Sequence, residues 1–359
     1  MQNGHGSHYM LQEILEEPVA LRETLAAIGS SCRKIASELA RERIGLIYFS
    51  GSGTSYHAAL ASQYLMSSLS AVPTNTIPAS EFDAWVRAPS ANRNVLIAIS
   101  QSGESVDVLS AVETAKKRGI KSVAITNAPS SQLVKASDFT VLTQAGPEKA
   151  VTATKTFVCC LAASFLLNFE LIEASQSYVG TNGALAFLRK ELDNSPEAVR
   201  ETIRLCTDQA KVVADYYREH SLFFLLGRGA NYATALEGAL KLKESCNVMA
   251  EGHAAREFLH GPMQLVDENT PVIAISTKSD YESLEPLSES FGRLGAPILR
   301  ISEFGLPRSE ESQLLVAEGL SESLSPLAFI VPIQLFAYYS AVSRGLNPDQ
   351  PTKLTKVVR

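Results

Sequence analysis

Short apolar runs alternate with amphipathic stretches along this chain. The apolar runs predict strands because they have no polar alternation, and the stretches between them have helical spacing. Strands that are apolar throughout and are separated by helices are typical of a parallel sheet covered by helices on both faces. The first part of the chain predicts strands at Leu46 to Phe49, Val95 to Ile99, Ser122 to Thr126 and Phe139 to Leu142, and helices at Tyr56 to Ser67, Val106 to Arg118 and from Thr154 onward.

The second part of the chain repeats this order. The predicted fold class is therefore α/β, with two tandem flavodoxin-like units, each a parallel sheet with helices on both faces. The predicted strands of the second part are Phe223 to Leu226, Val272 to Ile275 and Ile298 to Ile301, and its predicted helices are Thr234 to Met249, Tyr281 to Leu294 and Pro326 to Ser343.

The repeat is also visible residue by residue. Gly51 matches Gly227, which lies 176 residues later, and at the same offset Ile97 to Ser100 matches the identical tetrapeptide Ile273 to Ser276. A constant offset without gaps indicates two copies of one α/β unit. We expect each copy's own chemistry to lie where the copies differ.

The repeat and its flanks predict five segments. Pro18 is expected to interrupt the leading helix, and His5 and His8 are expected to be solvated in a loose tail over residues 1–9. The predicted segments are an N-terminal tail and helix at 1–30, a first α/β domain at 31–175, a helical connector at 176–220, a second α/β domain at 221–345 and an extended C-terminal tail at 346–359.

Composition narrows the class of protein. The 359 residues are 45% hydrophobic and 19% charged, which allows a sizeable core, and the formal net charge of −6 argues against nucleic acid as a partner. The five cysteines have no CxxC spacing, so we expect buried thiols in a reducing cytoplasm. The longest apolar run, Phe157 to Leu167, is too short for a membrane span and predicts a core or interface helix.

The most polar strand end in the sequence is Ser100 to Ser105 (SQSGES), which leads directly into a helix. Hydroxyl groups, a Gln amide and a helix N-terminus suit a phosphate monoester. Alternatively, Ser102 and Ser105 only cap the helix. The second copy has Thr-Lys-Ser at residues 277–279, so the fold itself does not require the serine cluster. Thr54 and Ser55 follow the first strand, and we expect the sheet order to bring them beside this serine loop.

The Gly-x-Gly pairs that follow the first strand of each copy invite comparison with a dinucleotide-binding loop. Both copies have a tyrosine, Tyr56 or Tyr232, where the third glycine belongs, and no acidic residue closes a following strand at the expected spacing. We therefore expect no nicotinamide or flavin, and no cofactor or metal.

Glu237, Lys241 and Glu244 lie at spacings of four and three, and so on one helix face. The pattern fits a surface ladder of ion pairs, or a carboxylate that shuttles a proton beside Lys241. His260 stands before Gly-Pro, which fixes it at a turn. Lys356 lies in the polar tail, where a flexible lysine is the ordinary expectation.

Together, SGSGTSY, SQSGES, ALEGALKLKE, AEGHAAREFLHGP and the tail DQPTKLTK resemble the sugar isomerase (SIS) family. The resemblance covers about Cys32 to Arg359. It is greatest to the isomerase half of glucosamine-6-phosphate synthase and to stand-alone glucosamine-6-phosphate deaminases of isomerase-domain type.

The resemblance implies roles for individual residues. Glu244 would move a proton between C1 and C2 with Lys241 and Glu237 as its partners, His260 would open the sugar ring from a neighbouring subunit, and Lys356 would form a Schiff base. That sharing implies a homodimer. The sugar phosphate would be bound by Thr54, Ser55, Ser100, Gln101, Ser102, Ser105 and the backbone of Val151.

The synthase has a glutamine-hydrolysing domain with a cysteine directly after the initiator Met, whereas Gln2 follows Met1 here. We therefore expect conversion of glucosamine 6-phosphate to fructose 6-phosphate and ammonia. Three alternatives stay open, namely a fructosamine-6-phosphate deglycase, an aldose and ketose phosphate isomerase that releases no nitrogen, and a non-catalytic sugar-phosphate sensor.

Overall fold

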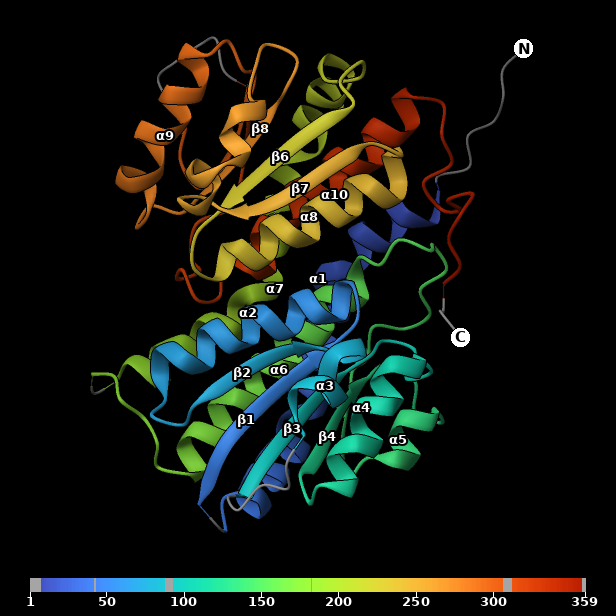
Figure 1. The fold of residues 1–359 in the computed structure, drawn as a ribbon, viewed down its shortest axis with the longest axis vertical. Coiled ribbons are helices and arrows are strands. Elements are labelled where there is room, and N and C mark those ends of the chain that lie inside the picture. Colours follow the sequence, from blue (N-terminus) through green and yellow to red (C-terminus); the bar gives the residue numbers. More distant parts are fainter. Residues whose placement is uncertain (1–7, 42, 88–92, 182, 306–311, 357–359) are drawn as a thin grey trace. The chain divides into compact units, whose positions relative to one another are not determined.

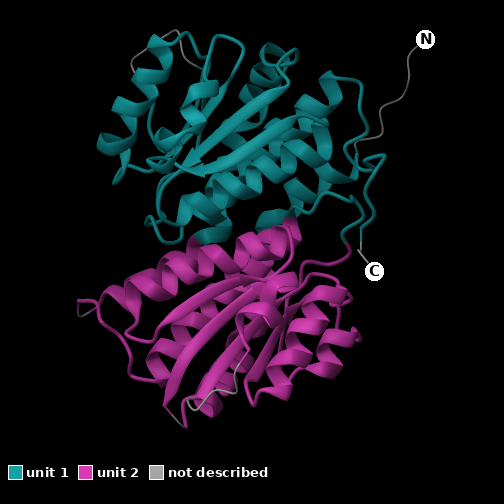
Figure 2. Ribbon diagram, in the orientation of Figure 1, with its two compact units in different colours: residues 1–18, 148–154, 195–356 teal, residues 19–147, 155–194, 357–359 magenta. Residues whose placement is uncertain are grey.

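The protein contains two parallel sheets. The computed structural model describes residues 8–41, 43–87, 93–181, 183–305 and 312–356, and within them the strands form two five-stranded sheets (Figure 1). The chain divides into two compact units, unit 1 with residues 1–18, 148–154 and 195–356, and unit 2 with residues 19–147, 155–194 and 357–359 (Figure 2). Each unit holds one sheet, which confirms the predicted fold class.

The sheet of unit 2 has the strand order β2-β1-β3-β4-β5, and all its pairings are parallel. The chain moves from β1 to one edge and then crosses back to β3. Its strands are β1 (Ile44–Gly51), β2 (Thr74–Pro78), β3 (Arg93–Ile99), β4 (Lys121–Thr126) and β5 (Phe139–Leu142). Its helices are α2 (Thr54–Leu69), α3 (Phe82–Trp85), α4 (Val106–Lys117), α5 (Gln132–Ala136) and α6 (Lys155–Ala174), with a short 3-10 turn η1 (Ala79–Glu81).

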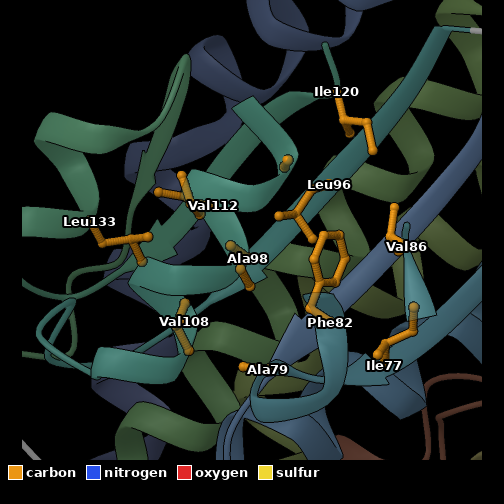
Figure 3. Close-up of a cluster of buried hydrophobic side chains, with 13 residues drawn as sticks. Ile77, Ala79, Phe82, Val86, Leu96, Ala98, Val108, Val112, Ile120 and Leu133 are labelled. Carbon is orange, nitrogen blue, oxygen red and sulfur yellow. The ribbon is translucent and has the colours of Figure 1, made fainter. Parts of the chain in front are cut away.

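Strand β3 is buried from Asn94 onward, as the apolar run predicts. Leu96 on β3 packs with Phe82 of α3 and with Val108 and Val112 of α4 in one apolar cluster (Figure 3). Alternate side chains of a strand point to opposite faces. The residues between those of the cluster are also buried, so both faces of β3 are covered.

The sheet of unit 1 has the order β10-β9-β8-β6-β7, the same arrangement as in unit 2. Two long helices, α1 (Tyr9–Leu39) and α7 (Ala184–Tyr216), contribute residues to both units. The strands of unit 1 are β6 (Leu222–Gly227), β7 (Met249–Ala254), β8 (Val272–Ser276), β9 (Ile298–Ser302) and β10 (Ser312–Leu315). Its other helices are α8 (Ala230–Cys246), α9 (Tyr281–Arg293) and α10 (Pro326–Ser343), with 3-10 turns η2 (Glu257–His260) and η3 (Pro262–Leu265).

The sequence repeat is a structural repeat. Gly53 and Gly229, which precede α2 and α8, have nearly the same backbone angles, with φ 54° and ψ −125° and with φ 54° and ψ −132°. A Cβ on Gly51 would lie 2.6 Å from the backbone of Ser55, and one on Gly227 would lie 2.0 Å from that of Asn231. The first glycine of each Gly-x-Gly pair is therefore required by the close approach of the following helix.

Two helices, α6 and α10, are long and apolar enough by length and composition to cross a membrane. Both are mostly buried among other elements of the protein, with 83% of the apolar window covered in each. This agrees with the core helix predicted from Phe157 to Leu167. All five cysteines are buried and free, which confirms the prediction of buried thiols.

Several local predictions were wrong. Pro18 lies inside α1 and does not interrupt it. The helix expected to reach Met249 ends at Cys246, because Asn247 takes a left-handed backbone conformation with φ 53°. The ring of His8 is half-buried and hydrogen-bonds with the Tyr338 hydroxyl at 3.3 Å, so it is not simply solvated. His5 lies outside the described residues.

Candidate functional site

The strand order of unit 2 brings the two predicted polar loops to neighbouring strand ends. Strands β1 and β3 are adjacent and parallel, with Ser50 opposite Ala98. The chain turns in opposite directions after these two strands, and ligands of open α/β sheets bind at the carboxyl ends of strands where this happens. Thr54 and Ser55 begin α2 after β1, and the loop Ser100 to Ser105 joins β3 to α4.

The loop after β3 is fixed by its own hydrogen bonds. The Ser100 hydroxyl accepts a bond from the Gly103 N–H at 3.2 Å, and the Gln101 carbonyl accepts one from the Asn127 N–H at 3.1 Å. Gly103 has φ +63°, and a Cβ there would lie 2.2 Å from the Ser131 hydroxyl. Glycine is therefore required at this position of the loop.

The serine hydroxyls of this loop do not cap α4. Ser105 occupies the N-cap position but makes no side-chain capping bond, and the Ser102 hydroxyl accepts a hydrogen bond from the Glu104 N–H, before the helix begins. Gln101, Ser102 and Ser105 are half-buried. Their polar groups are thus placed beside the N-terminus of a 12-residue helix, where an anion is favoured.

The equivalent place in unit 1 is occupied by a carboxylate of the protein itself. The Ser279 hydroxyl donates to Glu322 Oε2 at 3.1 Å, and a Cβ on Gly229 would lie 2.6 Å from Glu322 Oε1. Asp280 is buried beside it, and its pKa is raised to about 7, mainly by burial, with Glu322 adding to the effect. A second anion is therefore disfavoured at the N-terminus of α8.

Helix α8 buries a row of three ionisable side chains. Lys241 Nζ lies 3.2 Å from Glu237 Oε1 and 2.8 Å from Glu244 Oε2. The side chains of Glu237 and Lys241 are 1% and 0% exposed, whereas Glu244 is 18% exposed. The surface ladder of ion pairs is therefore wrong, because only Glu244 reaches solvent.

The charge of this row follows from its geometry. Burial alone would lower the pKa of Lys241, but Glu237 and Glu244 outweigh burial and the pKa is raised. Lys241 is therefore an ammonium at neutral pH. Its Nζ lies between the carboxyl groups of Glu237 and Glu244, of which Glu244 is the partly exposed one.

Lys356 is not a flexible tail residue. Its Nζ donates to Glu148 Oε2 at 2.6 Å and to the Ala150 carbonyl at 2.6 Å. Next to these residues, the Val151 N–H donates to the Asp349 carbonyl at 2.9 Å. The segment from Glu148 to Thr154, which we call the strap, is thus joined to the C-terminal tail at two places within unit 1.

His260 lies at the end of η2 and is exposed in the protomer. Gly261 follows it with φ +146°, a conformation that favours glycine, so the turn predicted from Gly-Pro is present. The imidazole is therefore accessible in the described structure.

Sequence reasoning missed the carboxylates that hold the strap. Both carboxylate oxygens of Glu13, on α1, accept bonds from the strap, from the N–H groups of Lys149 and Ala150. Glu17, one helical turn later, is fully buried. The spacing of four between Glu13 and Glu17, on the apolar face of a helix, could have indicated these two carboxylates. Glu148 lies in a loop with no periodic pattern, so no such spacing indicated it.

Comparison with known proteins agrees with the observed fold. The SIS domain family model matches residues 39–167 and 216–344. The chain is 36% identical to glutamine–fructose-6-phosphate aminotransferase (isomerizing) of Aquifex aeolicus over 99% of its own length, and it spans 58% of the length of that relative.

Solved structures give the same result. The C-terminal domain of glucosamine-fructose-6-phosphate aminotransferase from Francisella tularensis superposes with a TM-score of 0.89 at 30% identity, over 97% of this chain and 99% of that one. Glucosamine-6-phosphate deaminase from Thermotoga maritima gives 0.76 at 25% identity, over 98% and 99% of the two chains. With two matched copies that together exceed half its length, the chain belongs to the SIS domain family.

Proposed function

We propose that the protein is an amino-sugar phosphate isomerase and deaminase. It opens the ring of glucosamine 6-phosphate, transfers a proton from C2 to C1, and hydrolyses the resulting imine to fructose 6-phosphate and ammonia. The similar proteins named above, an isomerizing aminotransferase and a deaminase of sugar phosphates, support a phosphorylated hexose or hexosamine as the substrate. The proposal goes beyond those similarities in one respect, namely that the reaction runs towards the release of ammonia.

The buried row on α8 is the observation that carries this proposal. Proton transfer between neighbouring carbons needs a carboxylate that is ionised, positioned and able to reach substrate. The 2.8 Å bond to Lys241 positions Glu244, and its 18% exposure leaves it accessible. Glu237 completes the row by balancing Lys241 from the buried side.

The loop after β3 is the proposed phosphate site. Ser100, Gln101, Ser102 and Ser105, with Thr54 and Ser55 at the start of α2, offer hydroxyl and amide donors beside two helix N-termini. Both helices are long enough to favour an anion at this end, at 16 and 12 residues. The backbone of Val151 is the proposed contact to the sugar.

Two further residues complete the proposed mechanism. Lys356 is the amine that forms a Schiff base with the open-chain ketose, and its two hydrogen bonds give it a fixed position. His260 is the proposed ring-opening acid and base, supplied by the neighbouring protomer of a homodimer. Its exposure in the single protomer supports that assignment.

The decisive measurement is ammonia released from glucosamine 6-phosphate. We expect steady release by the wild type and a loss of about 10²- to 10⁴-fold in kcat for Glu244→Gln, since that is the contribution of a positioned base. The matched control is Glu282→Gln, which changes an exposed carboxylate on α9 and should leave kcat unchanged. A wild type that releases no ammonia would remove the deaminase assignment.

A substrate panel separates the alternatives. Release of an amine other than ammonia from an amine-linked fructose 6-phosphate identifies a deglycase. Interconversion of aldose and ketose phosphates without nitrogen release identifies a plain isomerase. Binding of all these sugars without turnover identifies a sensor, and the α8 row would then have no catalytic role.

A further inference from the structure

The amine of Lys356 has a dedicated carboxylate partner. Glu148 Oε2 and the Ala150 carbonyl each lie 2.6 Å from Lys356 Nζ. An ammonium has three N–H donors, so these two bonds leave one for another partner. The Glu148 side chain is 0% exposed and that of Lys356 is 25% exposed. The contact thus joins a buried carboxylate to a lysine whose side chain is partly exposed.

The carboxylate is itself held from several sides. Its second oxygen, Glu148 Oε1, accepts a bond from the Thr154 N–H at 2.9 Å, which closes the strap on itself. Glu13 accepts bonds from the next two N–H groups, those of Lys149 and Ala150. Because both the side chain and the following backbone are fixed, Glu148 has one orientation towards Lys356.

A lysine attacks a carbonyl only as the neutral amine, so the ammonium must first lose a proton. Among the described residues, the carboxylate in direct contact with Lys356 Nζ is Glu148. We infer that Glu148 positions Lys356 and receives a proton from its ammonium when the amine attacks the carbonyl carbon of the open-chain sugar. This inference rests on the proposed function for the identity of the sugar.

The step balances without an added reagent. The ammonium gives one proton to Glu148 Oε2, and the neutral nitrogen bonds to the carbonyl carbon, whose oxygen becomes the hydroxyl of a carbinolamine after proton transfer from nitrogen. That hydroxyl leaves as water with the proton stored on Glu148. The products are a protonated imine, one water molecule and the Glu148 carboxylate in its original state.

A first experiment tests the pairing without any sugar. A small acylating reagent is applied to the full chain, and labelling of each lysine is followed by mass spectrometry. We expect Lys356 to react more slowly than Lys353, which is exposed in the same tail, and Glu148→Gln to bring the two rates together. Equal rates in the wild type would overturn the inference whatever the variants do.

A second experiment tests the chemistry. Fructose 6-phosphate is added with sodium borohydride, and the reduced adduct on Lys356 is measured. We expect Glu148→Gln to slow adduct formation about 10²-fold with KM changed less than about threefold. Glu148→Asp should restore at least about tenfold of the loss, because aspartate keeps a carboxylate that can accept the proton.

The control is Glu303→Gln, which removes another carboxylate that accepts a backbone N–H, that of Lys278 at 3.1 Å, and should leave both experiments unchanged. An adduct that forms at the wild-type rate in Glu148→Gln contradicts this inference and leaves the proposed function standing. No adduct and no ammonia from the wild type would overturn both.

Discussion

The pKa of the buried Glu13 carboxyl is set by its surroundings. Burial raises its pKa from 4.5 to about 7, although the Lys149 N–H bond opposes the shift. Of the nearby charges, Glu148 raises the pKa further and Lys356 lowers it. The residue that orients the strap therefore titrates close to neutral pH.

The pH dependence of stability should reveal this group. In the folded state Glu13 keeps a proton between about pH 4.5 and 7 that it loses in the unfolded state, so its contribution to stability falls as pH rises through that window. We expect Glu13→Gln to flatten the decline in free energy of unfolding between these values, measured by urea titration. Glu16→Gln, on the exposed side of α1, is the control and should keep the wild-type slope.

The sequence predicted only part of the candidate site. Spacing placed Glu237, Lys241 and Glu244 on one helix face, but burial on α8 depends on its packing against α10, β6 and β7, which no local pattern reports. Lys356 was harder, because its partner Glu148 lies 208 residues away in sequence. Contacts of that separation are set by tertiary structure and leave no periodic signal.

At the scale of elements, the two copies use the same loop in opposite ways. In unit 2 the polar groups of the loop after β3 are half-buried and so remain partly accessible. In unit 1 the Glu322 carboxylate already lies against Gly229 and Ser279. Duplication thus produced two anion-favouring helix ends, one of which is occupied internally.

Titration calorimetry with fructose 6-phosphate should therefore give one site per chain. We expect Ser102→Ala to weaken binding about 10- to 100-fold, the usual value for a lost hydrogen bond to a charged group. Ser279→Ala, in the corresponding loop of unit 1, should leave affinity and stoichiometry unchanged. Two sites per chain, or equal losses in the two variants, would contradict the assignment of the phosphate to unit 2.

The strands that sequence reasoning missed share a position. β2, β7 and β10 all lie at the edge of a sheet, where one side has no neighbouring strand and the sequence need not be apolar throughout. Their segments, TNTIP, MAEGHA and SQLL, are accordingly more polar than β3 or β8. The central strands and most helices were predicted to within a few residues because burial on both faces leaves a strong pattern.

At the scale of the whole molecule, the proposed dimer makes a prediction about mixed protomers. If His260 acts on the site of its partner, a dimer of one Glu244→Gln chain and one His260→Ala chain has one intact site. Random mixing of the two inactive variants should then restore about a quarter of wild-type ammonia release per chain. If both residues act within one chain, the mixture stays as inactive as its components.

The two ends of the described chain are linked through Asp349. Its carboxylate accepts the N–H groups of Tyr9 and Met10, at 2.9 and 2.8 Å, in the first turn of α1. During synthesis these N–H groups have no bond to Asp349 until that residue is added, 340 positions after Tyr9. A ribosome that stops before Asp349 therefore releases a chain without the helix cap and without Lys356, so an incomplete product is less stable and also lacks the amine proposed to form the Schiff base.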